Sequence, residues 1–112
     1  MPLPGAKFPP PDTPKEKHMR HHIIVKFNDK VTDKAALLDE VTALFADSVR
    51  IPGVHGYSVH PNVIARDNRY DMMIVIHMDP AALPVYDACE MHHRWKDNYG
   101  HLIEKKAIFD CD

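Results

Sequence analysis

The chain alternates short apolar segments with segments of helical periodicity, in an order that few folds accept. Residues 22–27, HIIVKF, are rich in β-branched side chains and are followed by an Asn-Asp pair, so they predict a strand. A helix is expected next, capped by Thr32 or Asp33 and ended by the Pro-Gly pair at 52–53. The positions at helical spacing are Leu37, Leu38, Val41, Leu44, Phe45 and Ser48.

The second half of the chain contains one more strand before its helical segment. Residues 56–60 alternate between the two faces of a strand, and residues 70–78, YDMMIVIHM, predict a third strand. Pro80 fits the first turn of a helix, and helical character continues with interruptions to about Glu104. Residues 105–111 predict the last strand. The order β-α-β-β-α-β predicts an α+β, ferredoxin-like fold.

The second face of the predicted strands is mixed and not fully polar, and a single layer of helices can cover only one face of the sheet. One face of the third strand should pack on the helices, and it consists of Tyr70, Met72, Ile74, Ile76 and Met78. The opposite face would leave apolar side chains in water, namely Met73, Val75, Ile24 and Phe109. Burying each such side chain is worth about 1.5–3 kcal/mol. We therefore expect a two-fold homodimer with its sheets face to face, forming a dimeric α/β barrel.

Composition narrows the class of partner. Lys plus Arg number 14 against 16 acidic residues, a net charge of −2 without a basic patch, so we expect no nucleic-acid partner. No apolar run approaches the roughly 18–20 residues of a membrane span, and the N-terminal MPLPGAKFPPP does not resemble a secretory signal. Cys89 and Cys111 do not form a disulfide framework, so we expect free thiols and a cytoplasmic location.

Proline divides the chain into two parts. Six of the ten prolines lie between Pro2 and Pro14. Residues 1–20 are therefore expected to be an extended arm, either a disordered tail or a segment lying across a partner subunit, and residues 21–112 the folded domain.

Four segments, in their order and spacing, resemble the stress-responsive A/B barrel (Dabb) family. They are RHHIIVKFND, IPGVHGYSV, YDMMIVIHMDPAALPVY and EKKAIFD, and the resemblance runs from about Arg20 to Asp110. It implies a ferredoxin-like fold that dimerises into a barrel of two sheets. The family includes plant stress-induced proteins without established chemistry and a plant polyketide cyclase.

In that cyclase, a tyrosine and a histidine six residues later, within Tyr-x-x-His-Pro-x-His, act in an intramolecular aldol condensation. The matching stretch here keeps Tyr86 and His92, but has Cys89 in place of the first histidine and Glu90 in place of the proline. Side chains six residues apart do not share a face of a continuous helix, so a break is needed to bring them together. His21 matches a histidine at the start of the family's first strand.

Acid–base chemistry on a carbonyl compound needs a base near neutral pKa and a donor for the developing enolate oxygen. His92 can be the base and the Tyr86 hydroxyl the donor. The apolar pocket around them is expected to be walled by Ile23, Val25, Ile74, Trp95, Ile103 and Ile108. The alternative is that His92 packs at a helix end and Tyr86 is a core aromatic with a solvated hydroxyl.

The nine histidines do not follow the spacing of a metal site. His92 and His93 point about 100° apart on a helix. Glu90 and Cys89 could each meet His93, but no second helix repeats the unit. We therefore expect no metal and no cofactor.

The sequence thus predicts a dimeric barrel that binds a small apolar or aromatic molecule, with candidate acid–base chemistry of a cyclase, isomerase or lyase. The alternative function is a non-catalytic stress-response or assembly protein whose dimer is the functional unit. Whether the protein is an enzyme stays open at this point.

Overall fold

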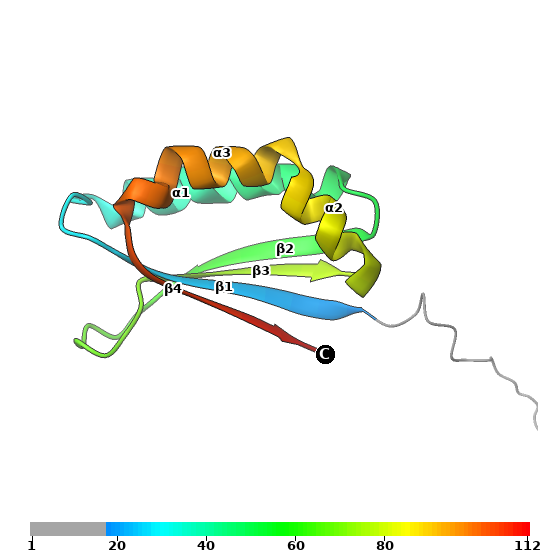
Figure 1. Cartoon of the computed structure of the whole chain (residues 1–112). Coiled ribbons are helices and arrows are strands. Elements are labelled where there is room, and N and C mark those ends of the chain that lie inside the picture. The colour runs from blue at the N-terminus through cyan, green and yellow to red at the C-terminus, as the bar shows by residue number, and fades with distance from the viewer. Residues whose placement is uncertain (1–17) are drawn as a thin grey trace, which may run out of the picture.

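The computed structural model describes residues 18–112, in which one four-stranded antiparallel sheet carries helices on one face (Figure 1). The strands are β1 (Met19–Phe27), β2 (Val54–Pro61), β3 (Met72–Met78) and β4 (Ile103–Cys111). The α-helices are α1 (Lys34–Phe45), α2 (Leu83–Ala88) and α3 (Glu90–Tyr99), and short 3₁₀ turns are η2 (Ala46–Arg50), η3 (Pro80–Ala82) and η4 (Gly100–Leu102). The predicted α+β, ferredoxin-like fold is confirmed. The arm expected over residues 1–20 lies almost entirely outside the described residues.

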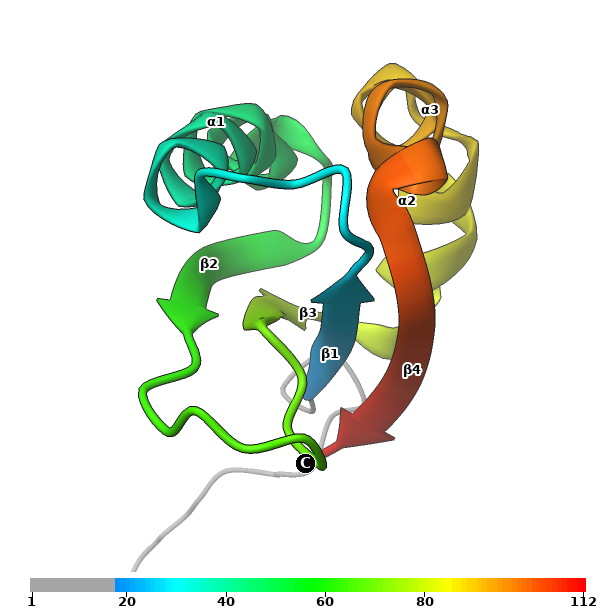
Figure 2. The same cartoon turned by 90° about the vertical axis from the view of Figure 1, so that its left-hand side faces the viewer.

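The strand order is β2-β3-β1-β4, so β1 is central and β4 forms one edge of the sheet. Both neighbours of β1 are antiparallel to it, and Ile23 lies opposite Ile74 on one side and Ile108 on the other. Figure 2 shows α1 and α3 side by side above the same face of the sheet. Within residues 18–112, no helix has the length and apolar character needed to cross a membrane.

A side-chain cap fixes the start of α1. The Asp33 carboxylate accepts a hydrogen bond from the backbone N–H of Ala36 at 3.0 Å, which satisfies one of the free donors of the first turn. Of the two expected caps, Asp33 is the one used. Leu37, Val41 and Phe45 then face the sheet and are buried.

The helix-facing side of the sheet is the core. Its fully or nearly buried strand residues are Ile23, Val25, Phe27, Met72, Ile74, Ile76 and Met78. The period of two assigned all of these side chains to this face, but it also assigned Tyr70, which precedes β3 and is half-buried. Trp95 and Phe45 close the core from the helices, with their ring centroids 5.2 Å apart.

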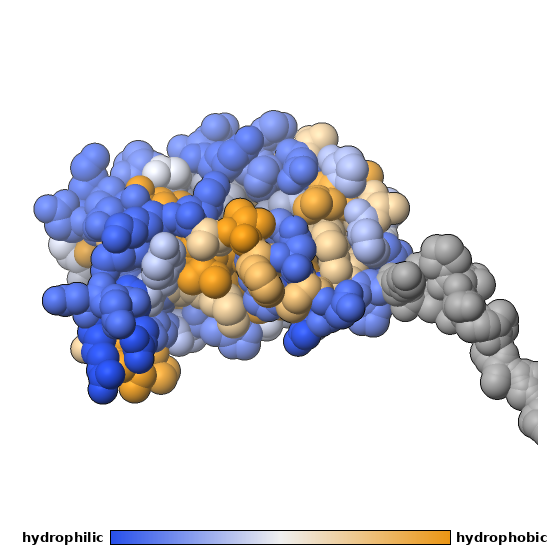
Figure 3. Space-filling view, turned by 60° about the horizontal axis from the view of Figure 1, so that its bottom comes forward, coloured by the Kyte–Doolittle hydropathy of each residue, from blue (hydrophilic) through white to orange (hydrophobic). Residues whose placement is uncertain are grey.

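None of the helices described here covers the other face of the sheet (Figure 1). An apolar patch occupies it (Figure 3), which includes the half-buried Ile24 and Met73 and the 60%-exposed Phe109. The expectation that Val75 would be left in water is wrong, because Val75 is only 6% exposed. It lies on an inner strand between His22 and Ser58, whose side chains flank it, whereas Phe109 lies on the edge strand.

Gly53 links the first helical segment to β2 in a conformation that other residues rarely adopt. Its φ is 90°, and a Cβ added there would lie 2.9 Å from the Cβ of Ala82. Gly53→Ala should therefore lower the free energy of unfolding by about 1–3 kcal/mol. Urea denaturation measures this effect. Gly100→Ala is the matched control, because a Cβ at Gly100 meets nothing within 4 Å. Equal stability of the two variants would contradict the prediction.

Candidate active site

A break in the second helical segment brings Tyr86 next to His92. α2 ends at Ala88, and Cys89 adopts an extended backbone (φ −76°, ψ 159°) before α3 begins. The Cys89 Sγ accepts a hydrogen bond from the backbone N–H of His92 at 3.4 Å, so the cysteine caps the helix that carries the histidine. The break forms without a proline at position 90, and the Tyr86 and His92 rings lie 4.7 Å apart between centroids.

Tyr86 carries a buried hydroxyl without a partner. The residue is 1% exposed, and among the described residues no group hydrogen-bonds to its hydroxyl. Burial raises the pKa of Tyr86 well above its ordinary value, helped by the nearby Cys89 and Asp87. The phenol therefore stays protonated and can donate. Leaving a buried hydroxyl unpaired costs about 1–3 kcal/mol, so this group would gain from a bound acceptor.

His92 is arranged as a neutral base. Its Nδ1 lies 3.0 Å from the backbone carbonyl oxygen of Asp87, and because a carbonyl only accepts, Nδ1 carries the hydrogen. The Nε2 lone pair is left to accept a proton. Burial is the main factor that lowers the pKa of His92. The positive charges of Lys96 and Lys106 lower it further, while Asp87 opposes them. The ring is thus neutral at pH 7.

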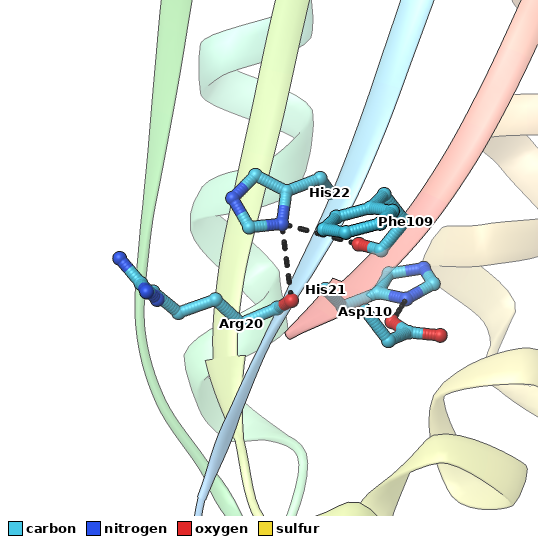
Figure 4. A network of polar contacts seen from close by, with 5 residues as sticks. All are labelled: Arg20, His21, His22, Phe109 and Asp110. Atoms are coloured by element: carbon cyan, nitrogen blue, oxygen red, sulfur yellow. Dashed lines mark hydrogen bonds and ion pairs between the residues drawn. The ribbon is translucent and has the colours of Figure 1, made fainter. Parts of the chain in front are cut away.

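A second histidine faces the same tyrosine. His21 is 5% exposed, its Nδ1 lies 2.5 Å from the Asp110 Oδ1, and its ring centroid is 5.3 Å from that of Tyr86. Figure 4 shows the two side chains directed toward each other from β1 and β4, whose register pairs these residues. The adjacent His22 lies on the opposite face of β1, with its Nδ1 3.1 Å from the carbonyl oxygen of Phe109.

These groups line a cavity of about 260 Å³ between the sheet and the α2–α3 segment. The lining residues are His21, Ile23, Leu83, Tyr86, Asp87, His92, Trp95, Lys106, Ile108 and Asp110. The two residues predicted for acid–base chemistry, Tyr86 and His92, therefore meet at one cavity.

Of the six residues predicted to line the pocket, only some line the cavity. Ile23, Trp95 and Ile108 line the cavity. Val25 and Ile74 are fully buried in the core and are not among the lining residues, and neither is Ile103 at the start of β4. The side chains of Val25 and Ile74 share the inward face of the sheet with Ile23, so the strand pattern alone could not separate them from cavity walls.

The sequence indicated His21 only through a family resemblance, and it gave no sign of Asp110, Lys106, Leu83 or Asp87. The positions of His21, Asp110 and Lys106 in the cavity depend on the pairing of β1 with β4, two strands that are far apart in the sequence. His21 and Asp110 are 89 positions apart, and only the register of β1 with β4 makes them neighbours. Polar residues that alternate with Ile108 on the last predicted strand, and so share its face, are the one local signal that could have singled out Asp110 and Lys106.

A larger cleft of about 440 Å³ lies between α1 and the loop that joins β2 to β3. Its ionisable groups already have partners. The Asp71 carboxylate accepts from the Phe27 backbone N–H at 2.8 Å and from the Lys34 Nζ at 2.9 Å. Burial alone would raise the pKa of Asp71, but these two partners outweigh it and the pKa is lowered. The cleft therefore offers no free acid or base. Across residues 18–112, no three His, Cys, Asp or Glu side chains gather as a metal site would require.

No family model matches the chain, and no curated protein sequence matches it. Solved structures do. A dimeric ferredoxin-like protein of unknown function from Thermobifida fusca aligns with a TM-score of 0.71 at 17% identity, over 83% of this chain and 88% of its own. A Dabb family protein with a ferredoxin-like fold from Mesorhizobium loti aligns with a TM-score of 0.62 at 17% identity, over 85% of this chain and 95% of its own.

An enzyme is also among the similar structures. A hydroxynitrile lyase from Passiflora edulis aligns with a TM-score of 0.67 at 11% identity, over 84% of this chain and 91% of its own. Identities this low establish the fold that these proteins share with the chain. The chain is thus an α+β protein of the ferredoxin-like fold, with a histidine- and tyrosine-lined cavity on the helical side of its sheet.

Proposed function

We propose that this protein is a Dabb-like barrel that binds a small aromatic carbonyl compound in the cavity and moves a proton on it. The reaction would be of the isomerase, cyclase or lyase type. The observation that carries the proposal is the buried Tyr86 hydroxyl, which lacks a partner among residues 18–112 and belongs to a ring that packs against both His92 and His21.

The cavity's size and walls set the class of ligand. At the roughly 30 Å³ that one water occupies in the liquid, 260 Å³ accommodates about nine non-hydrogen atoms. Ile23, Leu83, Trp95 and Ile108 provide apolar contact. A single aromatic ring with one carbonyl group has this size and character.

The proton transfer follows from the three polar groups. The carbonyl oxygen accepts a hydrogen bond from the Tyr86 hydroxyl, and the His92 Nε2 removes a proton from the neighbouring carbon. The electron pair of that C–H bond moves to the carbonyl oxygen, where the phenol stabilises the enolate charge. His21, oriented by Asp110, lies against the same phenol and can exchange a second proton. The lyase with this fold from Passiflora edulis supports chemistry on such a scaffold.

Deuterium exchange into the methyl group of acetophenone tests the proposal. The protein in D₂O should accelerate the exchange over buffer, followed by proton NMR. Tyr86→Phe should slow the catalysed exchange by about a hundredfold, the usual effect of losing one oxyanion donor. This variant removes an unpartnered hydroxyl, so it should unfold at the same temperature or higher.

Tyr57→Phe, on β2 and not among the cavity-lining residues, is the matched control and should keep the wild-type rate. The proposal is wrong if wild-type protein does not exceed buffer, or if Tyr86→Phe retains the full rate. If the protein is nevertheless a dimer, such a result would favour the alternative function, a non-catalytic assembly protein whose dimer is the functional unit.

We also infer that the protein is a homodimer that pairs the open faces of two sheets. The apolar patch on that face (Figure 3) supports this. Phe109, which belongs to the patch, is 60% exposed. The similar structures from Thermobifida fusca and Jannaschia, which are described as dimeric, also support a homodimer.

Phe109→Glu should dissociate the dimer, because it would place a carboxylate in a desolvated apolar interface. Sedimentation equilibrium should give about twice the 12.8 kDa chain mass for wild type and the single mass for the variant. Val49→Glu is the control, since Val49 is 48% exposed in η2 on the helical side of the sheet. If the wild-type protein is a monomer, the inference of a homodimer is wrong.

A further inference from the structure

The cavity contains one charged side chain that the proposed reaction does not use. The register of β4 pairs Lys106 with the core residue Val25, so Lys106 lies on the helix-facing side of the sheet together with Ile108 and Asp110. All three line the cavity. Within residues 18–112, none of the ion pairs involves Lys106. Its ammonium group is therefore available to a ligand that carries an anionic group.

The polar side chains of the cavity form a row of neighbours that begins at Lys106 and ends at Asp110. Lys106 is near enough to His92 for its charge to act on the imidazole. The rings of Tyr86 and His92 lie 4.7 Å apart, those of His21 and Tyr86 5.3 Å apart, and His21 bonds to Asp110. Four residues of a strand separate Lys106 from Asp110, about 13 Å along β4. The cavity thus has a cationic end and a histidine–carboxylate end, with the phenol between them.

The cavity is also lined by acidic residues. Asp87 is one of them, but it is exposed to water, and its backbone carbonyl, not its carboxylate, is the group that bonds to His92. Asp110 is already paired with His21. Among the described residues, Lys106 is therefore the one unpaired charge on the strand floor of the cavity, next to the apolar surface of Ile108.

A lysine on an edge strand can also serve to prevent edge-to-edge association of sheets, and β4 is an edge strand. Lys105 offers a direct comparison. It is the neighbouring residue, lies opposite Lys26 on the other face of β4, and is not among the cavity-lining residues. Edge protection would involve either lysine, whereas recognition of a ligand would involve only Lys106.

We propose that the molecule bound in this cavity is an aromatic or apolar acid, whose carboxylate pairs with the Lys106 ammonium while a carbonyl oxygen accepts from Tyr86. This inference rests on the proposed function and narrows its substrate from small carbonyl compounds to those that carry an anionic group. A charge-assisted hydrogen bond is about twice as strong as a neutral one, so an acid should be preferred over its uncharged isostere.

Benzoate and benzamide test this preference, because both have about nine non-hydrogen atoms, the size of the cavity, and they differ in charge. Each is titrated into the full chain at pH 7.5 and followed by ¹H–¹⁵N NMR. We expect wild-type protein to bind benzoate about tenfold more tightly than benzamide. Lys106→Met, which replaces the charged side chain by an uncharged unbranched one, should abolish the difference. Lys105→Met should retain it.

The outcomes separate this inference from the function on which it rests. If wild type binds both probes equally, and Tyr86→Phe weakens both, the carboxylate inference is wrong and the carbonyl site stands. The carboxylate inference is also wrong if Lys106→Met keeps the preference for benzoate. If neither probe shifts the resonances of cavity residues, and acetophenone is not exchanged, both proposals fail.

Discussion

Trp95→Ala should lower the free energy of unfolding by about 3–5 kcal/mol, because it removes the largest side chain of the core. Trp95 is 2% exposed, and its ring centroid lies 5.2 Å from that of Phe45 and 5.7 Å from that of Tyr99. The loss would be a large share of the roughly 5–15 kcal/mol that stabilises a domain of this size. Urea denaturation at fixed protein concentration measures it, since dimerisation would make stability depend on concentration.

Trp95→Phe is the matched variant. It keeps an aromatic ring against Phe45 and should cost less, about 1–2 kcal/mol. Trp95 also lines the cavity, so the alanine variant should bind benzamide more weakly even where it remains folded. A loss below about 1 kcal/mol for Trp95→Ala would mean that this side chain does not close the core.

His92→Gln should slow acetophenone exchange by about a hundredfold or more, because it removes the base while a glutamine amide can still donate to the Asp87 carbonyl. His93→Gln is the control. His93 is the adjacent residue of α3, is exposed, and does not line the cavity. His93→Gln should keep the wild-type rate. If the two substitutions slow the exchange equally, His92 is not the base.

The pH dependence of the wild-type rate gives a second test of His92. Its pKa is lowered from the ordinary 6.5, chiefly by burial, so the neutral base persists into more acidic solution than an exposed histidine would. The rate should be full at pH 7 and should fall only as pH drops through the lowered pKa, so that the midpoint of the acid limb lies below about 6.5. A midpoint above that value would contradict the burial of a neutral base.

Local sequence pattern was enough to predict the order of the strands and helices and the inward face of each strand. The period of two in residues 70–78 separated the buried Met72, Ile74, Ile76 and Met78 from the opposite face, and the structure places them in the core. The capping residue Asp33 begins α1 as expected, whereas α1 ends at Phe45 and a 3₁₀ turn, Ala46–Arg50, continues to just before the Pro-Gly pair. These features depend on neighbours within a few residues, which is why the sequence records them.

The site needed contacts that no local pattern contains. Whether residues 80–104 form one helix or two depends on Cys89, whose extended backbone ends α2 and whose thiol caps α3, although Glu90 stands where the family's proline would be. That break decides whether Tyr86 and His92 meet. The separation of Val25 and Ile74 from the cavity walls likewise depends on where the helices lie over the sheet.

By itself, therefore, the sequence determined the order of strands and helices, the inward face of each strand, and the pair Tyr86 and His92 as candidates. The tertiary structure alone decided that His21 bonds to Asp110 and that Lys106 joins the same cavity. The physical reason is strand register. A shift of one residue between β1 and β4 would turn all three β4 side chains, Lys106, Ile108 and Asp110, to the opposite face, and only the packing of the whole core fixes that register.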